Sequence, residues 1–177
     1  MTPPEDRAAI LSLARTSVEA AVHGRSAPAV PMSTLFRARA GAFVTLTMAG
    51  ELRGCIGRPE PHDPLGAVIV ECSGAAALQD PRFRPVSPGE LARLAIDVSI
   101  LTCPRRVNDP DGIVPGRHGL IIAKDGRRGL LLPQVAVEWG WTREVFLAQT
   151  CRKAGLPSGA WRDGAEMYVF EAEVITE

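Results

Sequence analysis

Two strand–turn–strand patterns constrain the fold of this 177-residue chain more than any other feature of its sequence. In the clearer pattern, residues 120–123 and 129–132 form two apolar runs on either side of Asp125-Gly126. Asp-Gly favours the two-residue turns that join adjacent antiparallel strands, because both of its residues accept a positive φ. The sequence therefore predicts a β-hairpin here, with two strands that run in opposite directions.

The second pattern lies earlier in the chain and is followed by further strand patterns. Residues 41–48 predict a strand, Ala49-Gly50 a tight turn and residues 51–56 the returning strand. Residues 96–100 and 168–174 also alternate along the chain in the way that half-buried strands do.

Helical patterns separate these groups of strands. Apolar residues recur at helical spacing after Thr2 and after Asp63, and a proline follows each, so these two residues are the expected N-caps. Ser87 and Glu90 predict a capping box before a short helix, and a further helix is expected at residues 142–154. Hairpins with helices between them predict an α+β fold with a largely antiparallel sheet packed with helices, rather than a parallel doubly wound sheet.

The composition is that of a globular protein with balanced charge. Hydrophobic residues make up 46% of the chain and charged residues 23%, and 20 basic residues face 20 acidic ones. This balance argues against a basic coat for non-specific nucleic-acid binding. No apolar run approaches the roughly 18 residues of a membrane span, and the N-terminus is acidic, so we expect a cytoplasmic protein without membrane contact.

The cysteine and histidine spacings predict neither a metal site nor a disulfide framework. The four cysteines are far apart and form no C-x-x-C pair, so free thiols are expected. Metal-ligand clusters, phosphate loops, nucleophile elbows and dinucleotide fingerprints are absent from the sequence, and we expect no metal and no cofactor.

Cys55 is the main candidate for chemistry, because a glycine precedes it and an arginine lies two residues before it. A nearby cation favours the thiolate, which is the nucleophilic form of cysteine, and on a strand Arg53 and Cys55 would share a face. Gly54 and Gly57 would allow a sharp backbone turn and the close approach of a ligand. The alternative is a buried, inert strand cysteine between packing glycines.

His118 follows a polar loop and precedes a predicted strand, which is a good position for an acid–base group. It would be the partner of Cys55 if the two residues meet in space. The alternative is a histidine that is bonded to its own loop.

Two further places in the sequence are candidates for ligand binding. Asp80, Arg82 and Phe83 place a cation beside an aromatic ring, which suits a phosphate or a nucleic-acid base, although such a set also forms structural salt-bridge corners. Gln134 could line a pocket, with packing as the alternative.

Six motifs in order resemble the AMMECR domain family, whose bacterial and archaeal group is called AmmeMemoRadiSam system protein A. The hallmark is the hexapeptide LRGCIG at residues 52–57. The other motifs include DPRF at 80–83, IDVSIL at 96–101, GRHGL at 116–120, LLLPQVA at 130–136 and CRKAGL at 151–156. Two places depart from the family pattern: Arg58-Pro59 replaces a small polar residue and an aromatic, and Asp97 stands where a glutamate is common.

The resemblance implies a single domain of residues 1–177 with two lobes, of which the larger carries the hexapeptide. It also supports a catalytic role for the candidates Cys55, Arg53 and His118. The expected binding residues are Gly54, Ile56, Gly57, Asp80, Arg82, Phe83 and Gln134.

Three functional hypotheses follow from the residues and the resemblance. The first is an enzyme or enzyme component that uses the Cys55 thiolate. The second is a non-catalytic scaffold for two partners that the resemblance implies: a Memo-type protein, similar to extradiol dioxygenases, and a radical-SAM enzyme. The third is an RNA-binding or RNA-modifying protein, whose contacts would come from Arg82, Arg84, Lys124, Arg127 and Arg128.

Overall fold

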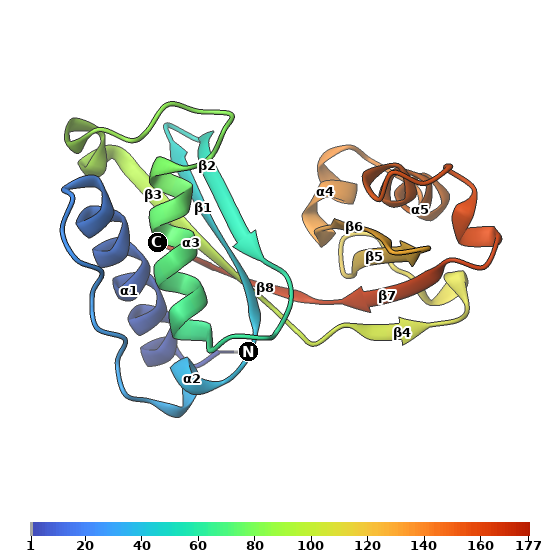
Figure 1. Ribbon diagram of the computed structural model, residues 1–177, viewed down its shortest axis with the longest axis horizontal. Helices are drawn as coiled ribbons and strands as arrows, with labels where there is room; N and C mark the ends of the chain where they lie inside the picture. The colour runs from blue at the N-terminus through green and yellow to red at the C-terminus, as the bar shows by residue number, and fades with distance from the viewer. Residues whose placement is uncertain (1) are drawn as a thin grey trace. The chain divides into compact units, whose positions relative to one another are not determined.

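The computed structural model describes residues 2–177, and these form two compact units (Figure 1). Unit 1 runs to Leu101 and also includes Glu173–Glu177, and unit 2 is Thr102–Ala172. Each unit contains its own four-stranded sheet and its own hydrophobic core. The predicted α+β class is therefore confirmed, with two small sheets in place of one.

Unit 1 is a sheet with two long helices on one face. The strand order is β2-β1-β3-β8, and β1 pairs antiparallel with both β2 and β3. The strands are β1 (Gly41–Met48), β2 (Glu51–Arg58), β3 (Leu94–Leu101) and β8 (Ala172–Thr176). The helices are α1 (Pro4–Val22), the short α2 (Thr34–Arg37), α3 (Leu65–Leu78) and the 3-10 helix Pro88–Arg93.

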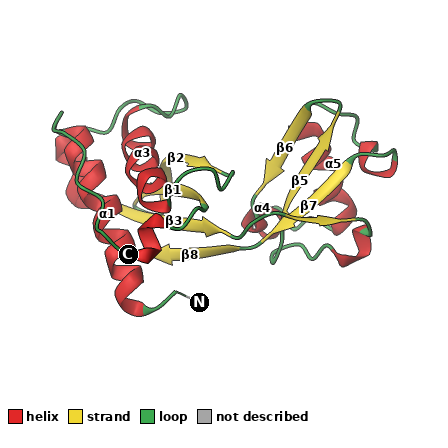
Figure 2. Ribbon diagram, turned by 60° about the horizontal axis from the view of Figure 1, so that its bottom comes forward, coloured by secondary structure: helices red, strands yellow, loops and turns green. Residues whose placement is uncertain are grey.

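Alternation along the strands sets which face of this sheet is the core. Val44, Leu46, Ile96 and Val98 are fully buried and pack against the helices. Figures 1 and 2 show α1 and α3 lying together on that face. Because side chains alternate across a strand, the residues between these positions belong to the opposite face, which we call the second face.

The hairpin of β1 and β2 forms as predicted. Ala49 and Gly50 both have positive φ, at 53° and 83°, and so make the tight turn between the strands. In β2, a β-carbon on Gly54 would lie 2.2 Å from the carbonyl oxygen of Ala76, so α3 crosses this strand at backbone contact.

Unit 2 contains the second predicted hairpin and a covering helix. Its strand order is β4-β7-β5-β6, with every pair antiparallel, and Asp125 and Gly126 turn the chain with φ of 50° and 76°. The strands are β4 (Arg105–Val107), β5 (Gly119–Lys124), β6 (Arg127–Leu131) and β7 (Glu166–Phe170). The helices are α4 (Pro133–Glu138), α5 (Arg143–Lys153) and the 3-10 helices Pro110–Gly112 and Ala160–Arg162.

Two predicted caps are wrong and one is confirmed. The helix α1 has Pro3 as its N-cap, because Thr2 donates from its nitrogen and hydroxyl to Glu173. Asp63 accepts a hydrogen bond from Arg58 and leaves Pro64 to precede α3. The Ser87 capping box is present, although the segment that it starts is a 3-10 helix.

No helix within residues 2–177 is long and apolar enough to cross a membrane.

Candidate functional site

Cys55 lies in β2 at the edge of the unit 1 sheet, directly opposite Thr45 of β1. Its backbone N–H donates to Asp80 Oδ2 at 2.8 Å, and its carbonyl oxygen accepts from Arg82 at 3.3 Å. Both groups therefore point away from β1, which makes Cys55 and Thr45 a non-hydrogen-bonded pair with closely spaced side chains. The Thr45 hydroxyl accordingly donates to the half-buried Cys55 sulfur at 3.3 Å.

Asp80 and Arg82 form a closed salt-bridge corner beside this cysteine. The guanidinium of Arg82 donates to both carboxylate oxygens of Asp80, at 2.9 and 2.7 Å. These bonds hold the pKa of the buried Asp80 carboxyl well below its usual range, against the effect of burial, and the Cys55 N–H assists. Arg82 also lies 5.4 Å from the centre of the Phe83 ring. The arrangement favours the structural alternative over a free phosphate site.

Arg53 is directed to a loop. The β1–β2 register shifts at this point, so that Arg53 is the extra residue of a β-bulge, and the two-residue period expected between Arg53 and Cys55 is interrupted. Its Nε donates to Glu90 at 2.8 Å, and its other nitrogens donate to the carbonyl oxygens of Arg84 and Pro85. The pKa of Glu90 is lowered to about 2. The main cause is the hydrogen bond from Arg53, and the N–H and hydroxyl of Ser87 add to it. A cavity of about 590 Å³ lies beside this ion pair.

The glycines and Ile56 of the hexapeptide serve packing. Gly54 is buried against the backbone of α3. A β-carbon on Gly57 would lie 2.3 Å from the Phe43 ring, so this aromatic side chain covers the glycine from the neighbouring strand. Ile56 packs against the unit 1 core.

A polar row crosses the second face of the unit 1 sheet. Cys55 is paired with Thr45, and Thr45 is paired with Asp97 of β3, so the three residues lie side by side on three strands. We call them the Cys55 row. Asp97 Oδ1 is buried and has no hydrogen-bond partner among residues 2–177. Ser99, two residues further along β3, is also buried on this face.

Thr45 and Asp97 were not predicted as site residues. Asp97 did carry a signal, because it is a charged residue in the middle of an apolar strand pattern. Thr45 carried none, since threonine is ordinary in strands.

His118 and Gln134 belong to unit 2, whereas Cys55 belongs to unit 1. The His118 ring is bonded within its own loop, where Nδ1 accepts the Val114 N–H at 3.1 Å, as the alternative for this residue expected. The pKa of His118 is lowered, mainly by burial and further by the charge of Arg117. The ring is therefore neutral near pH 7. Gln134 is half-buried in α4. The pairing of His118 with Cys55 and the binding role of Gln134 stay predictions.

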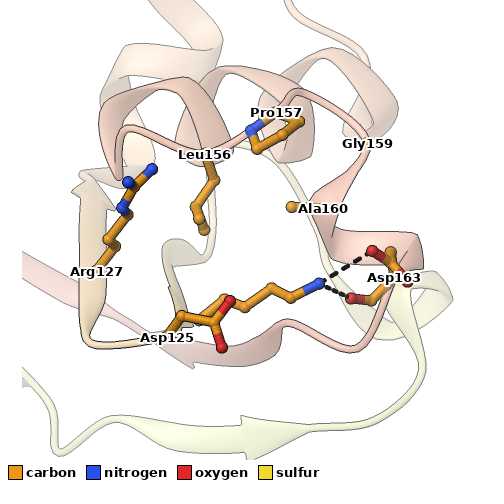
Figure 3. Close-up of a pocket in the computed structure, with 8 residues that line it drawn as sticks. Asp125, Arg127, Leu156, Pro157, Gly159, Ala160 and Asp163 are labelled. Carbon is orange, nitrogen blue, oxygen red and sulfur yellow. Dashed lines mark hydrogen bonds and ion pairs between the residues drawn. The ribbon is translucent and has the colours of Figure 1, made fainter.

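The basic residues at the second hairpin are engaged within unit 2. Lys124 donates to Asp163 Oδ2 at 3.0 Å, and Arg127 donates to the carbonyl oxygen of Gly155 at 2.7 Å. Figure 3 shows Arg127 and Asp163 on opposite sides of a cavity of about 470 Å³. No three His, Cys, Asp or Glu side chains in the described part of the chain gather into a possible metal site.

Known proteins match almost the whole chain. A model of the AMMECR1 family matches residues 11–175. A protein of Methanothermobacter thermautotrophicus is 43% identical over 95% of this chain and 92% of its own length. A protein of Thermococcus kodakarensis is 44% identical over 95% of this chain and 88% of its own length. The crystal structure of an uncharacterised protein of Pyrococcus horikoshii is similar with a TM-score of 0.86 and 40% identity, over 93% of this chain and 88% of that one.

Proposed function

Because the chain belongs to the AMMECR1 family, we propose that the cysteine of its hexapeptide is a nucleophile and that the protein is an enzyme or enzyme component acting through Cys55. The observation that carries the proposal is the Cys55 row, in which a thiol, a hydroxyl and a buried carboxylate oxygen lie side by side, the last without a hydrogen-bond partner among residues 2–177.

The thiol is held in a fixed position. Asp80 and Arg82 bind both backbone groups of Cys55, and the neighbouring Gly54 lies against the backbone of α3. The Thr45 hydroxyl then orients the sulfur. A reactive group that is positioned by rigid elements and a supporting set of bonds is what a nucleophile requires.

Asp97 indicates which substrates the site would prefer. A buried carboxylate oxygen without a donor is costly, so an O–H or N–H group of a bound molecule would satisfy it once the atoms that cover the oxygen move aside. The substrate class that fits is an electrophilic carbonyl compound with a hydroxyl or amino group. The sulfur–carbon bond forms as the carbonyl π pair moves to oxygen, and that oxygen takes up the proton that the thiol gives up.

The two other hypotheses receive less support. Arg82, Lys124 and Arg127 are all bonded within the protein, which weakens an RNA contact through them. A scaffold role with a Memo-type protein and a radical-SAM enzyme remains the alternative, and it predicts that the Cys55 thiol is dispensable.

Alkylation of the native protein by iodoacetamide, read by mass spectrometry, tests the proposal. We expect Cys55 to be alkylated ahead of the buried Cys72 and Cys151, with the exposed Cys103 as the internal control. Thr45→Val should change the rate at Cys55 by about fivefold, the equivalent of a hydrogen bond of about 1 kcal/mol, and leave Cys103 unchanged.

Protection by aldehydes tests the role of Asp97. Glycolaldehyde, which has a hydroxyl group, should protect Cys55 from alkylation better than acetaldehyde, which has none. The difference should disappear in Asp97→Ala. The proposal fails if Cys55 reacts no faster than Cys72 and Cys151, or if neither aldehyde protects it.

A further inference from the structure

His118 ends a tightly closed loop before β5. The carbonyl oxygen of Val114 accepts the N–H groups of Arg117 and His118, at 3.2 and 2.9 Å, and the Val114 N–H donates to His118 Nδ1. These three bonds fix the imidazole ring relative to its own backbone. They also occupy the lone pair on Nδ1.

The remaining nitrogen of this ring is a donor that has no acceptor in the part of the chain that the structure describes. A neutral imidazole whose Nδ1 accepts a hydrogen bond has its proton on Nε2. The nearest carboxylate oxygen, Glu171 Oε1, lies 3.9 Å from Nε2, which is too long for a hydrogen bond. The side chain of His118 is only 8% exposed. Within residues 2–177, the Nε2–H of this largely buried side chain therefore has no hydrogen-bond acceptor, and an external acceptor would complete it.

A small cavity lies beside His118. Its volume is about 170 Å³, and its walls are Thr102, Cys103, Arg105, His118, Val169, Phe170 and Glu171. Since a water molecule occupies about 30 Å³, the cavity has room for about five waters or one small polyatomic group. It is smaller than the roughly 300 Å³ at which pockets for whole drug-sized ligands begin.

The charges around the cavity favour an anion. The carboxylate of Glu171 is paired with Arg117 at 2.9 Å, so its charge is already balanced. The guanidinium of Arg105, by contrast, has no ion pair or hydrogen bond within the part of the chain that the structure describes. The hydroxyl oxygen of Thr102 accepts the Glu171 N–H, which leaves its own O–H free to donate.

We propose that this cavity binds a small oxyanion group, a phosphate or a carboxylate, through the Nε2–H of His118 and the guanidinium of Arg105. Oxyanions combine negative charge with several acceptor oxygens, which matches a neutral donor and a cation that line the same cavity. The site lies wholly within unit 2 and is independent of the chemistry proposed for Cys55.

Titration of the full chain with inorganic phosphate and with acetate, followed by the nitrogen-15 and proton shifts of the His118 imidazole, tests the site. At least one ion should produce a saturable shift at Nε2 with a dissociation constant of about 1 mM. Glycerol 3-phosphate serves as a third probe. Tighter binding than phosphate identifies the group as part of a larger molecule, and equal binding identifies a free ion.

Matched variants separate a built site from general attraction by positive charge. His118→Asn keeps an oxygen for the Val114 N–H and removes the Nε2–H, so affinity should fall by about tenfold, or about 1.4 kcal/mol. Arg105→Gln should weaken binding to a similar extent. Arg106→Gln is the control, because Arg106 is the next residue of β4 but pairs with Glu166, and it should leave affinity unchanged.

The proposal is overturned if no probe gives a saturable shift up to about 100 mM, a hundred times the expected dissociation constant. Equal losses in Arg105→Gln and Arg106→Gln would also overturn it. A thermal melt of each variant shows whether it folds, and Arg105→Gln decides the question if His118→Asn does not.

Discussion

Asp80 in unit 1 and His118 in unit 2 are both buried titratable side chains, and they differ in how their polar atoms are used. Asp80 is charged, and both of its oxygens accept hydrogen bonds from Arg82 and from the Cys55 backbone. His118 is neutral and lines a cavity; its Nδ1 is bonded, and its Nε2 has no acceptor among residues 2–177. A saturated group stabilises the fold and has no capacity left for a ligand, whereas an unsaturated one costs stability and can bind.

The same contrast separates the candidates within unit 1. Arg53 and Glu90 are paired with each other and with a loop, so we assign them to the structure. Asp97, which the sequence did not single out as a site residue, has a buried oxygen, Oδ1, without a partner in the described residues 2–177. The comparison predicts that an unpartnered polar group marks a site better than the presence of a charge does.

The largest expected effect concerns the contact of Gly54 with α3, next to the residue that Asp80 and Arg82 bind. Gly54→Val places a β-carbon 2.2 Å from the Ala76 carbonyl oxygen, so the backbone of α3 or of β2 would have to shift. We expect unit 1 to lose at least about 3 kcal/mol of stability, measured by urea unfolding. Gly89→Ala, which adds a methyl group into open space, should leave stability nearly unchanged.

Asp80→Asn tests whether the saturated carboxylate is structural. It should cost about 2 kcal/mol near pH 7, because hydrogen bonds to a charged group are lost. The native pKa of Asp80 lies below the unfolded value of about 3.9, so its contribution is complete above that pH and is lost as the pH falls toward the native value. The variant should lose less stability than the wild type on acidification. Asp163→Asn, at an exposed carboxylate, is the control.

Arg53→Gln should have a moderate effect of about 1 kcal/mol, since it breaks a partly exposed pair with Glu90. The pKa of Glu90 is about 2 in the native state, so this contribution is lost between the unfolded value of about 4.3 and about pH 2. The rate of Cys55 alkylation should not change. A fall in that rate would show that Arg53 acts on the Cys55 thiol. The contrast between fully bonded groups and groups that lack a partner would then be wrong for Arg53.

The smallest effect is expected for the pH dependence of stability in His118→Asn. The native pKa of His118 lies below the unfolded value of about 6.5, so the unfolded chain takes up a proton first as the pH falls. Wild-type stability should therefore be greater at pH 7 than at pH 5.5, by a margin that shrinks in the variant. Thermal midpoints at the two pH values measure it, and an unchanged margin would show that His118 is not the group responsible.

The hairpins could be predicted from the sequence because their determinants are local. Ala49-Gly50 and Asp125-Gly126 adopt the positive φ values that their residue types allow, and each pairs strands that are adjacent in the chain. The Ser87 capping box was equally local. Thr2 was predicted as a cap and is bonded to Glu173 instead, because a partner from the far end of the chain competes with the local bond.

The candidate site could be predicted only in part. The hexapeptide directed attention to Cys55, but its neighbours depend on the pairing of β1 with β3, strands that are far apart in the sequence. That register places Thr45 beside Asp97, and tertiary packing sets it. The period-two argument for Arg53 failed because a single bulge residue changes the direction of a side chain.

The bonds from Asp80 and Arg82 to Cys55 also decide how another chain can approach this edge. An uncovered edge strand is a template on which a strand of another chain can pair. In β2 the outward N–H and C=O of Cys55 are already bonded to Asp80 and Arg82. Sheet extension along β2 is blocked at the residue that holds the thiol. Any molecule that reaches the sulfur must arrive over the second face, where recognition depends on side chains.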